Sequence, residues 1–144
     1  ALVSSTQKFK FVVMGGQFLN TAKKFETYSN YGFDKEREEI IKHIHKHKIK
    51  NVIFISGDRH HSEINMLKKE GMPVIYDITT SPLTSGVASI WEDEVNTLRL
   101  KGSLINQRNF SIFELSGPKE KRTLKLNFYD SNGNAIFKHI IQAE

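Results

Sequence analysis

Apolar residues in the first half of the chain recur with two different periods, and each period predicts a different element. Residues 8–14 and 51–56 are short apolar runs, and each is followed by a turn that contains glycine. Such runs are typical of strands that are buried on both faces of an α/β sheet. Between them, over about residues 35–48, isoleucines recur at helical spacing, as at Ile40 and Ile44. The order strand, helix, strand predicts a right-handed βαβ unit with parallel strands.

Charges along the predicted helix suit a helix dipole. Asp34 precedes the helix and is expected to cap it, acidic residues crowd its first turns, and basic residues lie at its end. His43 and His47 lie one turn apart, a spacing that can chelate zinc, but the acidic residues of a zinc-protease motif are missing. A solvated basic helix end is therefore the favoured interpretation.

The middle of the chain continues the sheet. Residues 64–67 and 74–78 are predicted to form two further strands, joined by a turn at residues 68–71. Residues 79–86 then form a loop of small polar residues. A short helix is expected around Trp91, which we interpret as a packing residue.

The last third changes character, because apolar and polar residues now nearly alternate. Residues 109–115, 123–129 and 135–141 show this pattern, and turn-forming residues separate them. The pattern predicts a three-stranded antiparallel meander that covers one face of a sheet. Residues 130–134 superficially resemble a calcium loop, but the glycine and glutamate that an EF-hand requires are missing. We interpret them as a hairpin turn.

Composition narrows the class of protein. With 144 residues, 38% hydrophobic and 26% charged, residues 1–144 are expected to form a single globular domain. The net charge of +5 is not gathered into one cationic stretch interleaved with aromatics, so no nucleic-acid partner is expected. Cysteine is absent, which excludes disulfides and thiolate metal sites. No apolar run reaches the roughly 18 residues of a membrane span, so none is expected.

Candidate chemistry follows the second predicted strand directly. After Ser56-Gly57 come Asp58, Arg59, His60 and His61. The carboxyl end of such a strand is where open α/β folds place ligands. A carboxylate and an imidazole two residues apart are suitable ligands for divalent metals, and an arginine can bind a phosphate in bidentate fashion. The loop at 79–86 is expected to approach the same edge. The alternative is a plain turn, capped by Asp58, with His60 bonded to the backbone.

These residues carry a resemblance to a known family. Residues 53–60, Ile-Phe-Ile-Ser-Gly-Asp-Arg-His, resemble the last metal-binding motif of PhoD-like phosphatases, a branch of the calcineurin-like metallophosphoesterases. The Gly-Asp-x-His pattern of that branch matches Gly57, Asp58 and His60. The likeness extends in order to the strand ending at Gln17, the helix at Glu36-Arg37, the loop at 78–83 and the closing strands from Asn109.

The resemblance implies a fold and an activity. The fold would be α/β, the C-terminal half of a layered metallophosphoesterase-like β-sandwich with flanking helices. The activity would be metal-dependent hydrolysis of phosphate mono- or diesters by a metal pair, from among Ca, Mn, Fe or Zn. Asp58 and His60 would be metal ligands, and Arg59 and His61 catalytic residues that contact the phosphate or support the ligands. The family is often exported, so an exported or periplasmic location is implied.

The chain also departs from the family pattern. The earlier ligand motifs of the family lie upstream of the last one, and none of them is found here. Two protein ligands cannot close a dinuclear site. We therefore expect the missing N-terminal half of the same protein to supply the others, and the isolated chain to be inactive. Gln17 is a weaker ligand candidate, since the wider superfamily has histidine there. The rival hypothesis is a non-catalytic α/β binding or scaffold module that lacks a complete metal site.

Overall fold

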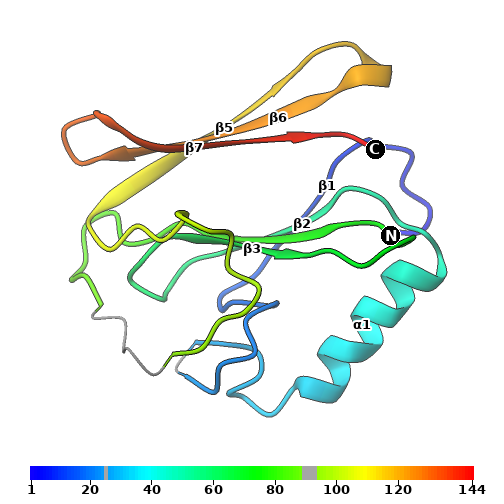
Figure 1. Ribbon diagram of the computed structural model, residues 1–144, viewed down its shortest axis with the longest axis horizontal. Coiled ribbons are helices and arrows are strands. Elements are labelled where there is room, and N and C mark those ends of the chain that lie inside the picture. The colour runs from blue at the N-terminus through cyan, green and yellow to red at the C-terminus, as the bar shows by residue number, and fades with distance from the viewer. Residues whose placement is uncertain (25, 89–93) are drawn as a thin grey trace.

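The computed structural model describes residues 1–24, 26–88 and 94–144, and its strands form two sheets (Figure 1). The elements in chain order are β1 (Lys10–Val13), α1 (Asp34–Lys46), β2 (Val52–Ser56), β3 (Glu63–Leu67), β4 (Ile75–Thr79), β5 (Asn109–Ser116), the 3-10 helix η1 (Lys119–Lys121), β6 (Thr123–Asp130) and β7 (Ala135–Gln142). The fold is thus mixed α/β and dominated by strands. The short helix expected around Trp91 lies outside the described residues.

The first sheet has the strand order β1-β2-β4-β3. Strands β1 and β2 pair in parallel, with Val12 opposite Phe54, and α1 connects them. The parallel βαβ unit predicted from the apolar pattern is confirmed. Strand β4 also runs parallel to β2, whereas β3 is antiparallel to β4. As a result, the carboxyl ends of β1, β2 and β4 and the start of β3 meet at one edge.

Both ends of α1 differ slightly from the prediction. Phe33 occupies the N-cap position without a side-chain cap, and Asp34 is the first helical residue, so the predicted capping role of Asp34 is wrong. Its charge still lies in the first turn, where the dipole favours it. The helix ends at Lys46 because Lys48 adopts a left-handed φ of 49°. The amide of Ile49 then donates to the carbonyl of Ile44, which closes the helix in a Schellman motif.

The second sheet is the predicted antiparallel meander, with the order β5-β6-β7. Its second turn is a hairpin, as expected. The Asp130 carboxylate accepts hydrogen bonds from the backbone amides of Asn132 and Asn134 at 2.9 and 2.8 Å. These bonds occupy the carboxylate that a calcium loop would offer to its ion.

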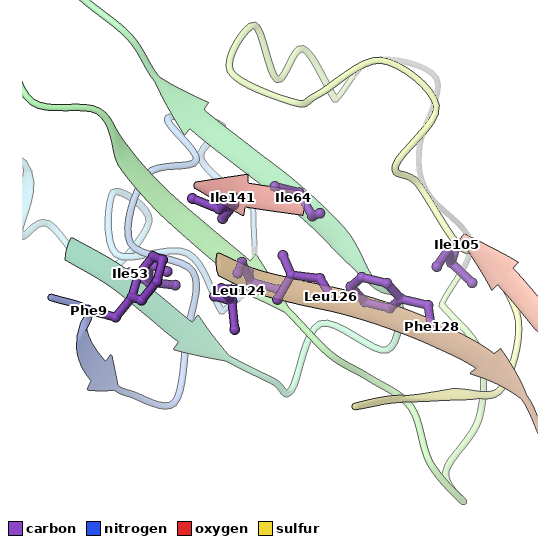
Figure 2. Packing of buried hydrophobic residues seen from close by; sticks show 9 residues of the cluster. Phe9, Ile53, Ile64, Ile105, Leu124, Leu126, Phe128 and Ile141 are labelled. Carbon is purple, nitrogen blue, oxygen red and sulfur yellow. The ribbon is translucent and has the colours of Figure 1, made fainter. Parts of the chain in front are cut away.

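Two apolar clusters bury the two faces of the first sheet. Alternation along β2 directs Ile53 toward the meander and Val52 and Phe54 toward α1. The cluster between the sheets contains Phe9, Ile53, Ile64, Ile78, Ile105, Leu124, Leu126, Phe128 and Ile141 (Figure 2). The cluster on the helix side contains Phe18, Leu19, Ile41, Ile44, Ile49, Val52, Phe54 and Ile75. The meander therefore covers one face of the first sheet, and α1 covers the other.

In the part of the chain that the structure describes, no helix combines the length and apolar character needed to cross a bilayer.

Candidate functional site

The turn after β2 lies where three strand ends meet. Ser56 at the end of β2 pairs with Thr79 at the end of β4, and the amide of Thr80 donates to the Ser56 carbonyl at 2.9 Å. On the other side, the amide of Gly57 donates to the carbonyl of Gly15, which follows β1, at 3.3 Å. The loop from residue 79 thus approaches the turn, as predicted from the sequence.

Asp58 and His60 share an unusual backbone conformation. Their φ angles are +62° and +56°, in the left-handed region that residues other than glycine rarely adopt. Asp58 is exposed and His60 is half-buried. Within the described residues, neither side chain forms a hydrogen bond or an ion pair. The plain-turn alternative required Asp58 to cap the turn and the backbone to bond the His60 ring, and neither contact is present among these residues.

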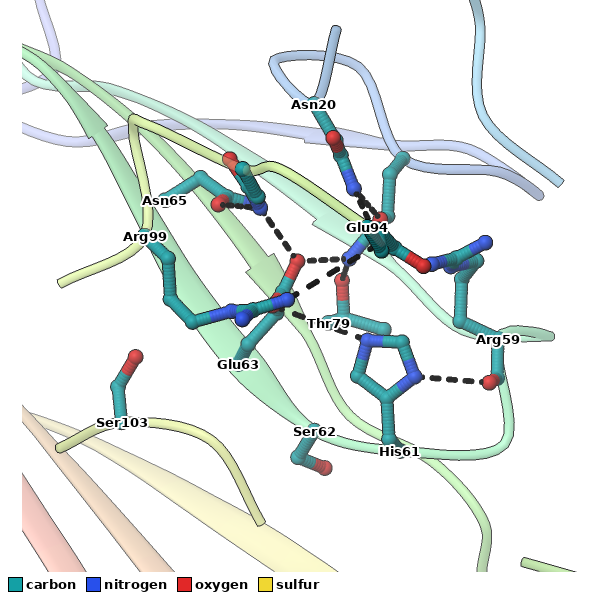
Figure 3. Close-up of polar contacts among 12 residues, drawn as sticks. Asn20, Arg59, His61, Ser62, Glu63, Asn65, Thr79, Glu94, Arg99 and Ser103 are labelled. Atoms are coloured by element: carbon teal, nitrogen blue, oxygen red, sulfur yellow. Dashed lines mark hydrogen bonds and ion pairs between the residues drawn. The ribbon is translucent and has the colours of Figure 1, made fainter. Parts of the chain in front are cut away.

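Arg59 and His61, in the same turn, are buried. Figure 3 shows the Arg59 guanidinium beside the Glu94 carboxylate, with Nη2 2.5 Å from Oε1. The His61 ring bonds through Nδ1 to the Arg59 carbonyl at 2.9 Å, and its Nε2 lies 3.8 Å from Oε2 of Glu63. Both predicted catalytic residues therefore contact buried protein groups, and their roles stay predictions.

Glu63 is the centre of a buried polar network beneath the turn. Its Oε1 accepts hydrogen bonds from the side-chain amides of Gln17 and Asn96 at 2.7 and 2.9 Å, and its Oε2 accepts one from Arg99. Burial alone would raise the pKa of Glu63, but the contacts with His61 and Arg99 outweigh it and lower the pKa to about 2. The carboxylate is thus held in its charged form.

Gln17 is fully engaged in this network. Its Nε2 donates to Glu63 and also to Thr79 Oγ1 at 2.7 Å, while its Oε1 accepts from Asn20 at 2.8 Å. The side chain is completely buried. Gln17 links three segments at the sheet edge, and a ligand role for it stays a prediction.

The loop that follows Gln17 is held from two sides. Arg37 of α1 donates from Nε to the Phe18 carbonyl at 2.8 Å and from Nη2 to the Leu19 carbonyl at 2.7 Å. Asp77 of β4 accepts the Leu19 amide at 2.8 Å. Asp77 is fully buried, and burial raises the pKa of this carboxyl to about 7.

Glu63, Glu94, Arg99 and Asp77 were not recognised from the sequence. A weak signal existed for Asp77, because it interrupts an apolar strand run, where a charge must find a partner. Glu94 gave no such signal. It pairs with Arg59 across 35 positions of the chain, a relationship that no local pattern reveals.

The metal-ligating residues that the structure brings together are few. Asp58 and His60 present an oxygen and a nitrogen donor, a set that suits Ca, Mn, Fe or Zn. No cluster of three or more His, Cys, Asp or Glu residues suited to a metal ion occurs in residues 1–24, 26–88 and 94–144. His43 and His47 are both exposed at the end of α1, with ring centroids 4.3 Å apart, in keeping with a solvated helix end. The donors at the turn fit a metal, but they form only part of a site.

Comparison with known proteins places the chain in a family. The sequence profile of the PhoD-like phosphatases matches residues 2–118. A solved structure described as the structure of PhoD superposes with a TM-score of 0.70 at 16% identity and covers 99% of this chain. This likeness concerns the fold, and the chain spans 31% of that solved chain. No curated protein matches the sequence. By its match over residues 2–118, the chain belongs to the PhoD-like phosphatase family.

Proposed function

We propose that this chain forms part of a metal-dependent phosphoric ester hydrolase that acts on phosphate mono- or diesters. Asp58 and His60 serve as metal ligands in this proposal. The observation that carries it is the position of these two side chains, at the carboxyl ends of three strands, with no partner among the described residues. Membership of a phosphatase family supports the reaction class. It also supports an exported location, which fractionation of cells expressing the complete protein would test.

Asp58 and His60 would hold one side of a metal pair. When bound, such ions neutralise the charge of the phosphoryl oxygens and activate water. The left-handed backbone at both residues supports this role, because strained conformations cluster at functional sites. The chain's own contribution is to fix two donors at a rigid sheet edge.

The remaining ligands come, in this proposal, from the missing N-terminal half of the same protein. An open apolar edge supports such a partner. Val13 of the edge strand β1 is 78% exposed, and Leu115 of the edge strand β5 is 52% exposed. A groove of about 150 Å³ adjoins these two strands and is lined by Phe11, Ile55, Phe113, Leu115 and Leu124. Apolar edge strands of this kind are normally covered by another segment.

The test compares the complete protein, this chain alone, and two variants of the complete protein. We expect hydrolysis of p-nitrophenyl phosphate or its bis ester by the complete protein, loss of that activity with EDTA, and none from the chain alone. Asp58→Ala and His60→Ala should each lower activity by about 100-fold or more and leave the melting temperature of the metal-free protein unchanged. Glu39→Ala and His43→Ala, on the exposed face of α1, are the matched controls.

Two results would contradict the proposal. Full activity in Asp58→Ala, accompanied by a large loss of stability, would make the residue structural. An inactive complete protein, whose metal affinity does not respond to either substitution, would favour the non-catalytic binding or scaffold module.

A further inference from the structure

The turn after β2 divides its side chains between two surroundings. Asp58 and His60 have left-handed backbones and no partner among the described residues, whereas Arg59 and His61 are 7% and 1% exposed. A left-handed conformation costs about 1–2 kcal/mol for a typical residue other than glycine, and aspartate and histidine adopt it more readily than most. Since two such residues occur within three positions, the surroundings must stabilise the turn.

Several contacts hold this backbone, beginning with the Arg59 amide, which donates to the Gly57 carbonyl at 2.7 Å. The Arg59 guanidinium binds Glu94 at 2.5 Å, and the His61 ring bonds to the Arg59 carbonyl at 2.9 Å. The amide of Ala88 donates to the His60 carbonyl at 3.0 Å. The side chain of Arg59 thus fixes the residue that lies between the two proposed ligands.

Glu94 is itself held firmly. Its Oε1 accepts a hydrogen bond from Asn20 at 3.1 Å and lies 3.9 Å from Nη2 of Arg99. Arg99 in turn binds Glu63 at the start of β3 (Figure 3). Buried charges are costly to separate from their partners. The alternating charges therefore connect the turn to the rigid sheet and resist displacement of Arg59.

We propose that Arg59 and Glu94 form a positioning pair for the proposed metal site. The pair sets the backbone of the turn and thereby directs Asp58 and His60 toward the metal. In this arrangement Arg59 orients the two metal ligands and does not bind the phosphate. The inference rests on the proposed function, because a positioning role requires that Asp58 and His60 bind a metal.

The test uses the complete PhoD-like protein and Mn²⁺ as the probe. We expect Arg59→Gln and Glu94→Gln each to lower the affinity for Mn²⁺ by about 10-fold to 100-fold, the usual effect of removing a group that orients a ligand. The double variant should lose no more than the worse single variant, because both substitutions break one interaction. At saturating Mn²⁺, the KM for p-nitrophenyl phosphate should stay near the wild-type value.

Arg37→Gln is the matched control, since Arg37 is also buried and bonds to the backbone carbonyls of Phe18 and Leu19, and none of its hydrogen bonds reaches a residue of the turn. It should lower the melting temperature and leave Mn²⁺ affinity unchanged. An equal loss of Mn²⁺ affinity in this control would overturn the inference in favour of general destabilisation. A rise in KM and in the inhibition constant of inorganic phosphate, in Arg59→Gln alone, would overturn it in favour of phosphate binding.

Asp58→Ala separates this inference from the proposed function. If Asp58→Ala leaves Mn²⁺ affinity unchanged, the metal function fails and the inference fails with it. If Asp58→Ala lowers the affinity while Arg59→Gln and Glu94→Gln do not, the positioning role alone is wrong.

Discussion

Nε2 of Gln17 lies 2.7 Å from Oε1 of Glu63, although the two residues are 46 positions apart in the chain. Gln17 follows β1 and Glu63 begins β3, the two edge strands of the first sheet. Thr79, at the end of β4, accepts a second bond from the same amide nitrogen. Polar contacts thus cross the whole carboxyl edge of the sheet beneath the proposed ligands, and their loss should affect stability in measurable ways.

Replacing Glu63 by Gln should remove a stabilising charge. The folded pKa of Glu63, about 2, lies below its ordinary value of 4.5, so its contribution is complete above pH 4.5 and is lost as the pH falls toward 2. A difference of this size corresponds to about 3 kcal/mol. In denaturant unfolding, Glu63→Gln should be less stable than wild type at pH 7, and the difference should shrink by pH 3. Glu70→Gln, in an exposed turn, is the control. A difference that is independent of pH would contradict the assignment.

Asp77 should have the opposite dependence on pH. Burial raises its folded pKa to about 7 from 3.8, so the folded state binds more protons than the unfolded state between these values. Its contribution is therefore complete below pH 3.8 and is lost as the pH rises to about 7. Asp77→Asn should flatten the decline in melting temperature between pH 4.5 and 7. Equal declines in the two proteins would show that Asp77 ionises normally in the folded chain.

Much of the fold follows from local patterns in the sequence. A strand buried on both faces is a continuous apolar run, as at residues 51–56, whereas a strand buried on one face alternates apolar and polar residues, as at residues 123–129. The turn with Asp58 and His60 could be located for the same reason, since it follows a buried strand. Its left-handed backbone could not be predicted, because aspartate and histidine adopt that conformation more often than most residues but in a small minority of positions, so their identity alone does not specify it.

The polar network around Glu63 could not be predicted from the sequence for a different reason. Glu94 bonds to Asn20 across 74 positions, and Asn96 bonds to Glu63 across 33. Such pairs depend on how distant segments pack, and the residues themselves resemble ordinary surface residues of loops. Arg59 is a further case: its bond to Glu94 spans 35 positions of the chain, and its phosphate-contacting role stays a prediction.

The packing of the two sheets predicts that alanine substitutions in two strands of the meander lower the stability by very different amounts. Leu126 of β6 is fully buried between the sheets, whereas Ile140 of β7 is 45% exposed. Leu126→Ala should destabilise the chain by about 2–5 kcal/mol, because it leaves a cavity, and Ile140→Ala by less than about 1 kcal/mol. Denaturant unfolding checks both values. Similar small losses would mean that the meander is not packed on the first sheet.

The two glycines after β1 should respond differently to alanine. A Cβ at Gly16 would lie 2.4 Å from the Glu26 carbonyl oxygen, whereas a Cβ at Gly15 would meet nothing within 4 Å. The Glu26 carbonyl cannot move freely, because it accepts the amide of Gln17 at 2.8 Å. Gly16→Ala must therefore displace the loop that places Gln17 under the turn, at a cost of about 1–3 kcal/mol. Gly15→Ala should change stability by less than about 0.5 kcal/mol. Thermal unfolding of the two variants measures the contrast, and equal melting temperatures would show that the loop does not pack closely against Gly16.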